Sequence, residues 1–143
     1  MTSCFQTLDN NCLQACIASI FDLPLEAAPH VFANGGGWTN AKWARLTDWA
    51  RTRDYDLVWI EADNREAAAL KQSSGHYIAV FYTLDGGAHA VVMRRGKVVF
   101  DPAWGGAGIT GKPRHYFVFK RRGGLTPAVR TELERWLGPL LPT

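Results

Sequence analysis

The stretch HAVVMRRGKVVFD, residues 89–101, decides how the second half of the chain folds. Two short apolar runs flank Arg95-Gly96, a glycine-containing pair that suits a tight turn between antiparallel strands. In such a hairpin the start of the first strand lies beside the end of the second. We therefore expect His89 and Asp101, which stand at those two ends, to be neighbours in the folded protein.

More strand-like runs surround this hairpin. They cover residues 55–60, 76–83 and 116–119, and residues 85–87, Asp-Gly-Gly, supply another turn. Together with the strands at 89–93 and 98–100, these runs predict an antiparallel meander.

Helical patterns dominate the first half of the chain. Asn11 can cap a helix that ends before Pro24, and Gln14, three residues after Asn11, completes a capping box. We expect further helices over residues 25–31, 39–51, 64–72 and 126–137. Thr39 and Thr126 would cap the second and the fourth of these. The last helix should have a buried stripe formed by Val129, Leu133, Trp136 and Leu137. Helices followed by a small antiparallel sheet predict an α+β fold.

The composition bounds the class of protein. The 143 residues suit one domain, and the net charge of +3 is too small for a dedicated nucleic-acid binder. No run of about eighteen apolar residues predicts a membrane span. The three cysteines, with no leader-like segment before them, argue against a disulfide framework. We therefore expect a cytoplasmic protein with reduced thiols and with neither a nucleic-acid nor a membrane partner.

Four residues form a candidate catalytic set. Cys12 would stand at a helix start, where free backbone N–H groups and the helix dipole stabilise a thiolate. His89 could act as its base, and Asp101 could hold the imidazole in the useful tautomer. The side-chain amide of Gln6, six residues before Cys12, could donate to an oxyanion together with the Cys12 backbone N–H.

Each of these residues also has a plainer interpretation. Cys12 could be an apolar core residue, as we expect of Cys16, and His89 could be a core histidine bonded to the backbone. Gln6 could be a surface glutamine in a loop, and Asp101 could belong to an ordinary Asp-Pro turn. His76 heads another apolar strand and competes with His89. The spacing of the cysteines does not favour a zinc site, so we expect no metal. Residues 35–38, which begin with three glycines, and Trp104 are candidates for the rim of a substrate cleft.

The set as a whole is more specific than its members. Gln6, the helical run 11–18 (NCLQACIA), the strand 87–92 (GAHAVV) and the run 100–105 (FDPAWG) follow the order Gln, Cys, His, Asp. In this the chain resembles the papain-like cysteine peptidases, and among them the C39-like peptidases, although its Asn11-Cys12-Leu13 differs from the Asp-Cys-Gly usual there. The resemblance spans roughly residues 6 to 106.

The resemblance implies one papain-like domain over residues 1–143, with N-terminal helices packed on a small antiparallel sheet. It also implies a thiol protease or related hydrolase that cleaves a peptide or isopeptide bond in a peptide or protein substrate, using Cys12, His89, Asp101 and Gln6 and no cofactor. Two alternatives stay open. One is acyl transfer at the same site, as in a deamidase or a transglutaminase. The other is a binding module that keeps the fold without turnover.

Overall fold

The structure, a computed structural model, describes residues 1–6, 10–84, 87–103, 105–106, 108–122 and 127–138. It is an α+β fold built on a five-stranded antiparallel sheet with the strand order β1-β5-β2-β3-β4. The elements are α1 (Cys12–Ile20), α2 (Asn40–Thr52), β1 (Tyr55–Glu61), α3 (Arg65–Ala69), β2 (Tyr77–Thr83), β3 (Ala88–Arg94), β4 (Lys97–Phe100), β5 (Ile109–Arg121) and α4 (Pro127–Leu137), with 3-10 turns at Leu25–Ala27 and Leu70–Gln72.

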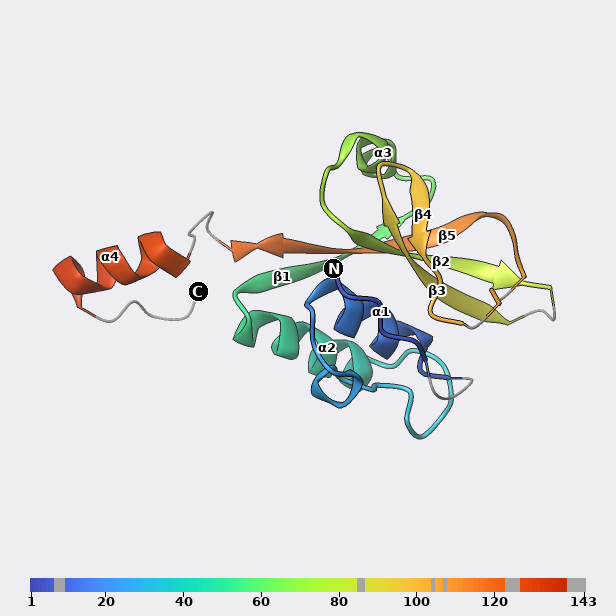
Figure 1. Ribbon diagram of the computed structural model, residues 1–143, viewed down its shortest axis with the longest axis horizontal. Coiled ribbons are helices and arrows are strands. Elements are labelled where there is room, and N and C mark those ends of the chain that lie inside the picture. Colours follow the sequence, from blue (N-terminus) through green and yellow to red (C-terminus); the bar gives the residue numbers. More distant parts are fainter. Residues whose placement is uncertain (7–9, 85–86, 104, 107, 123–126, 139–143) are drawn as a thin grey trace.

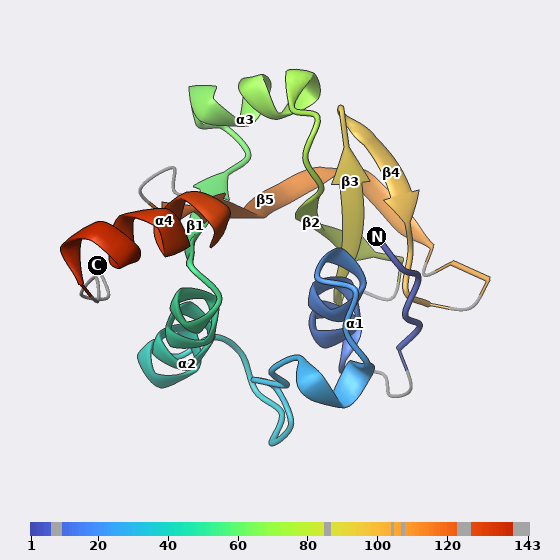
Figure 2. The same ribbon diagram turned by 60° about the vertical axis from the view of Figure 1, so that its left-hand side comes forward.

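The sheet separates two layers of helices. Helices α1 and α2 lie on one face and α3 lies on the other (Figures 1 and 2). Because side chains alternate along a strand, each strand supplies both layers. The α1 face carries Ile78, Val80, Ala90, Val92 and Phe117, and the α3 face carries Tyr77, Ala79, Phe81, Val91 and Met93.

Aromatic rings fill the space between α2 and the sheet. The rings of Trp38, Trp43 and Trp59 meet edge to face at centroid distances of 5.6 to 5.7 Å, and Phe117 joins them from β5. Such contacts stabilise a core beyond the apolar area that they bury. They fix α2 and the loop before it against the strands that border the candidate site.

The sheet is not the simple meander predicted from the sequence. Strands β2, β3 and β4 do follow one another, but β5 runs back between β1 and β2 and pairs with both. It also begins at Ile109, seven residues before the predicted start. Gly111 and Pro113 weaken the strand signal there, and the pairing with β2 is irregular between Val80 and Tyr82.

Two predicted helices differ in the structure. The helix expected over residues 25–31 is only a 3-10 turn, because Ala28 is extended (φ −91°, ψ 148°) before Pro29, and a residue before proline avoids the helical region. The prediction that Trp136 and Leu137 are buried is wrong, because they are 78% and 72% exposed. Helix α4 projects beyond the end of β5, so the sheet does not cover these side chains (Figure 1). Thr126 and the side chains of Val129 and Leu133 lie outside the described residues.

The predicted starts of the helices are confirmed at Thr39 and Asn64, whose side chains accept hydrogen bonds from the backbone of α2 and α3. Helix α1 also begins where expected, but Asn11 makes no side-chain cap, so the expected capping box does not form. The Asn11 side-chain amide instead donates to Gln14 Oε1 at 3.4 Å, and the Gln14 amide donates to the carbonyl oxygens of Leu25 and Ala28.

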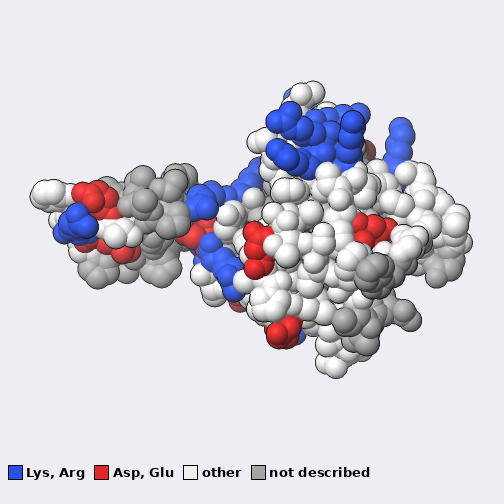
Figure 3. All heavy atoms as spheres, in the orientation of Figure 1, with Lys and Arg blue, Asp and Glu red and all other residues white. Residues whose placement is uncertain are grey.

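The charged surface is uneven. Lys and Arg gather around α3 and the β3–β4 turn (Figure 3), where Arg94, Arg95 and Lys97 are exposed. This turn lies at the opposite end of β3 from His89. Across the part of the chain that the structure describes, the helices are too short or too polar to cross a membrane.

The packing of α1 yields a stability prediction. Ile17 is fully buried between α1 and the sheet, so Ile17→Ala should lower the free energy of unfolding by about 3 kcal/mol through lost burial and a residual cavity. Urea denaturation measures this loss. Val99→Ala, on the exposed side of β4, should cost less than about 1 kcal/mol. Equal losses at the two positions would show that α1 does not form the core.

Candidate active site

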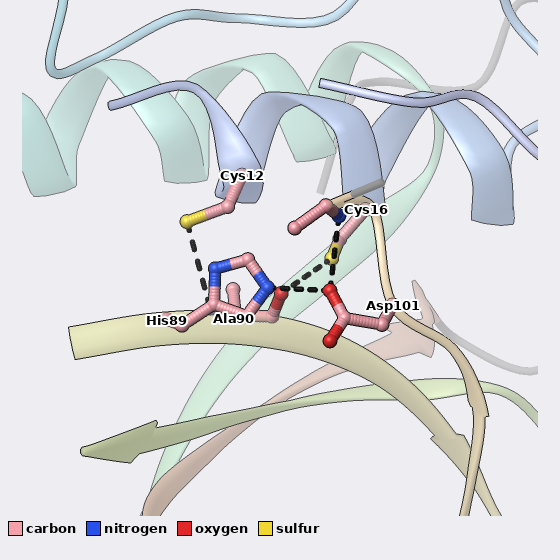
Figure 4. A network of polar contacts seen from close by, with 6 residues as sticks. Cys12, Cys16, His89, Ala90 and Asp101 are labelled. Atoms are coloured by element: carbon pink, nitrogen blue, oxygen red, sulfur yellow. Dashed lines mark hydrogen bonds and ion pairs between the residues drawn. The ribbon is translucent and has the colours of Figure 1, made fainter. Parts of the chain in front are cut away.

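Helix α1 and strand β3 bring Cys12 and His89 together. Cys12 is the first residue of α1, and the Ala90 backbone N–H donates to its sulfur at 3.5 Å. One helical turn later, the Cys16 thiol donates to the Ala90 carbonyl oxygen at 3.4 Å (Figure 4). Two cysteines on one face of α1 therefore hold one residue of β3, and His89 precedes that residue directly.

The β3–β4 hairpin brings Asp101 to the other side of the His89 ring. The distance from His89 Nε2 to Asp101 Oδ1 is 2.6 Å, and the same oxygen accepts a hydrogen bond from the Ala103 backbone N–H at 2.9 Å. The other ring nitrogen, Nδ1, faces the Cys12 sulfur (Figure 4). The imidazole thus lies between a thiol and a carboxylate, as the hairpin in the sequence predicted for the His–Asp pair.

The electrostatics of this group favour a charged pair. Burial acts to raise the pKa of Cys12, but the hydrogen bond with His89, the Ala90 and Leu13 backbone N–H groups and the charge of His89 outweigh it and lower that pKa. Burial likewise acts to lower the pKa of His89, but its hydrogen bonds and charge interactions with Cys12 and Asp101 raise it. Opposite shifts in the two partners favour a thiolate beside an imidazolium.

The other two cysteines lack this environment. Cys16 is fully buried, and burial, followed by the nearby charges of Cys12 and Asp101, raises its pKa well above the ordinary value. The pKa of Cys4 is raised too, by burial and by the charge of Glu26. Cys16 is therefore a core residue, as predicted, and Cys12 is the thiol whose surroundings favour the thiolate.

His76, the competing histidine, lies at the wrong end of the hairpin. It directly precedes Tyr77, which pairs with Met93, whereas His89 pairs with Phe81 at the other end of β2 and β3. Burial, with the charges of the N-terminus and Arg94, lowers the pKa of His76. Its register on the sheet therefore separates it from Cys12.

Gln6 lies near the Asp101 loop. Its backbone N–H donates to the Pro102 carbonyl oxygen at 3.0 Å, and its side chain is half-buried. Gln6 is not among the described residues that line the cavity beside Cys12. The structure thus places Gln6 on the Asp101 side of the site, and its contact with an oxyanion stays a prediction.

A cavity of about 450 Å³ opens beside Cys12 and His89. Its lining includes residues 35–38, which the sequence suggested for a cleft, whereas Trp104 lies outside the described residues. Sequence reasoning missed four lining residues from the sheet: Val80, Arg114, His115 and Phe117. The period-two spacing of His115, Phe117 and Phe119 could have indicated that His115 shares the inner face of a longer strand.

The glycine segment at the cavity rim is anchored at several points. The Lys42 ammonium donates to the carbonyl oxygens of Gly35 and Gly37 at 2.6 and 2.8 Å. Gly35 and Gly36 have φ values of 76° and 75°, which glycine adopts without strain. The Asn10 side chain also donates to the Phe32 carbonyl oxygen at 2.9 Å. These contacts tie the rim both to α2 and to the segment just before Cys12.

Among the described residues, no three His, Cys, Asp or Glu side chains gather as the ligands of a metal ion would. Comparison with family models, with curated proteins and with solved structures finds no match for the chain. Any statement on function therefore rests on the geometry and chemistry of the site itself.

The site predicts which histidine activates Cys12. At pH 6 an ordinary thiol, with a pKa of about 8.5, is almost entirely protonated and reacts slowly with iodoacetamide. His89→Ala removes the partner that stabilises the thiolate, so alkylation of Cys12 should slow by roughly tenfold or more. Peptide mapping by mass spectrometry measures the rate at each cysteine.

His76→Ala is the matched control and should leave the rate at Cys12 unchanged, because His76 lies at the far end of the hairpin. Loss of Cys12 reactivity in His76→Ala, or its persistence in His89→Ala, would contradict the assignment of the base.

Proposed function

We propose that this chain is a papain-like cysteine hydrolase that cleaves a peptide or isopeptide bond with Cys12 as nucleophile. The observation that carries the proposal is the position of one imidazole between a thiol whose pKa is lowered and a carboxylate at 2.6 Å. The arrangement matches what thiol catalysis requires, which is a nucleophile, a base within reach and a group that orients the base.

In the first step, the proton of the Cys12 thiol moves to Nδ1 of His89. The sulfur then attacks the substrate carbonyl carbon, a C–S bond forms, and the carbonyl electrons become an oxyanion. The backbone N–H of Cys12, one of the first N–H groups of α1, and the Gln6 amide would donate to that oxygen.

The C–N bond then breaks, and His89 returns its proton to the leaving amine. In the second half-reaction, His89 takes a proton from a water molecule, which attacks the thioester and releases Cys12. The net reaction adds one water across the amide bond. Asp101 keeps Nε2 protonated and leaves Nδ1 to exchange protons with sulfur and substrate.

The surroundings of the triad support acyl chemistry. Cys12 is partly exposed at the cavity, so a substrate carbonyl can reach the sulfur, whereas Cys16 is sealed in the core. The nucleophile begins a helix that packs against the strand bearing the base, which agrees with the helix-on-sheet layout that the papain-like resemblance implies. A single domain of this kind needs no cofactor for the steps above.

A degenerate library of peptides, some joined through lysine side chains, tests this function by product mass. Hydrolysis adds one water and separates two fragments. Conversion of Gln to Glu would instead identify a deamidase, and loss of ammonia with a new amine attached would identify a transglutaminase. We expect cleavage, with water rather than an amine as the acyl acceptor, because the cavity opens beside Cys12. Deamidation also uses water, but it leaves the peptide in one piece.

Cys12→Ala should lower kcat/KM by about 10⁴-fold or more, since it removes the covalent pathway. Cys4→Ala is the matched control and should retain activity, because Cys4 is not among the described residues that line the cavity. A wild-type protein that binds peptides from the library yet leaves every mass unchanged would favour the binding module.

A further inference from the structure

Another cavity, of about 650 Å³, opens on the α3 face of the sheet, opposite the face on which α1 carries Cys12. Helix α3, the β3–β4 turn and the start of β5 surround it. Its floor includes Tyr77, Phe81 and Met93, which belong to the apolar core of this face. Val98 of β4, which pairs with Met93 and is 43% exposed, extends the apolar floor to the surface.

Lysine and arginine side chains surround this cavity. They gather around α3 and the β3–β4 turn (Figure 3). Some line the cavity and the others are exposed in the β3–β4 hairpin, and together they are Arg65, Lys71, Arg94, Arg95, Lys97 and Lys112. Two contacts bring the hairpin and the segment after α3 together. Lys71 Cγ lies 3.2 Å from the place that a Cβ on Gly96 would take, and Arg94 Nε donates to the Ser74 carbonyl oxygen at 2.8 Å.

These cations are not neutralised by the protein itself. Among the residues that the structure describes, none of the six forms an ion pair with a carboxylate. Two acids come from the same region, Asp63 at the cavity and Glu66 on α3, and they do not balance six cations. Like charges that gather in this way repel one another, and an acidic ligand relieves the repulsion.

We propose that this cavity is a docking site for an acidic segment of a protein partner, in which Asp or Glu residues flank an apolar side chain. The carboxylates of the segment pair with the lysines and arginines at the rim, and its apolar side chain packs on Met93 and Val98. The site lies on the other face of the sheet from Cys12, so the proposal does not rest on the proposed function.

The floor of the cavity favours a peptide over other anions. A small anion would meet the charges of the rim and gain nothing from an apolar floor. The bases of a single-stranded nucleic acid need exposed rings on which to stack, whereas Tyr77 and Phe81 are only 2% and 6% exposed. An apolar peptide side chain instead covers the exposed part of Val98. An acidic peptide therefore uses both the rim and the floor.

An NMR titration tests the docking site without requiring turnover. The ¹⁵N-labelled Cys12→Ala protein is titrated with a set of short peptides in which Asp and Glu flank a central Leu, Phe or Met. We expect the backbone amide resonances of Gly96, Val98 and α3 to shift, and those of His89 and Ala90 to stay in place. Replacing the acids of the peptide by Asn and Gln should weaken binding about tenfold or more.

Two pairs of variants separate the rim from the floor. Lys71→Glu combined with Arg95→Glu should weaken binding of the acidic peptides about tenfold or more, since two attractive charges become repulsive. Arg45→Glu combined with Lys120→Glu makes the same change in net charge away from the cavity, and should change binding less than about twofold.

For the floor, Val98→Asn should weaken binding about fivefold, because it removes apolar area from the cavity. Val99→Asn is its matched control. Val99 is 45% exposed, against 43% for Val98, but it is not among the described residues that line the cavity, so binding should not change. Thermal unfolding checks that each variant is folded.

Three results would overturn the proposal. One is that none of the acidic peptides shifts Gly96 or Val98, which needs no substitution at the cavity. Another is that the two charge-reversed variants bind the peptides equally well. The third is that a single-stranded oligonucleotide of the same charge binds this face more tightly than every peptide in the set. Because no bond is cleaved in these assays, a failure to hydrolyse the peptide library would contradict the proposed function alone.

Discussion

The candidate site depends on two hydrogen bonds between α1 and Ala90. The pairing of β4 with β3 ends at Val92, so β4 does not pair with Ala90. The Ala90 N–H instead donates to the Cys12 sulfur, and the Ala90 carbonyl oxygen accepts from the Cys16 thiol. These two contacts, one helical turn apart, set both the height and the rotation of the helix on the strand. With Ala90 held in this way, the adjacent His89 must present its ring near the start of α1.

The same geometry gives the thiols of Cys12 and Cys16 different environments. Cys12 lies at the open end of α1, where backbone donors and an imidazole lower its pKa, whereas Cys16 lies one turn deeper, where burial raises its pKa. Asp101 hydrogen-bonds to Nε2 of His89, and this contact leaves Nδ1 facing the sulfur of Cys12 (Figure 4). The start of α1, the start of β3 and the residue after β4 thus lie close together. The proposed chemistry depends on this proximity.

Local signals in the sequence were enough for part of this arrangement. The Arg95-Gly96 turn predicted that His89 and Asp101 would be close, and the Asn11 position predicted the start of α1. The path of β5 between β1 and β2 was not predictable from local patterns, because Gly111 and Pro113 hide its first half and its partners lie far away in sequence. For that reason the strand predicted over residues 116–119 stops short of His115, although His115 lines the cavity. Pairing between distant strands, rather than propensity, decides which faces share a site.

We expect Cys12 and His89 to form a thiolate–imidazolium pair, and an NMR titration measures the protonation of both groups. Labelling cysteine with ¹³C at Cβ and histidine with ¹⁵N reports both groups across one pH series. Cys12 should titrate below the ordinary thiol pKa of about 8.5, and His89 above the ordinary imidazole pKa of about 6.5. His89→Ala should raise the pKa of Cys12. If Cys12 titrates at or above the ordinary thiol value and its pKa does not respond to His89→Ala, the two residues do not form the charged pair.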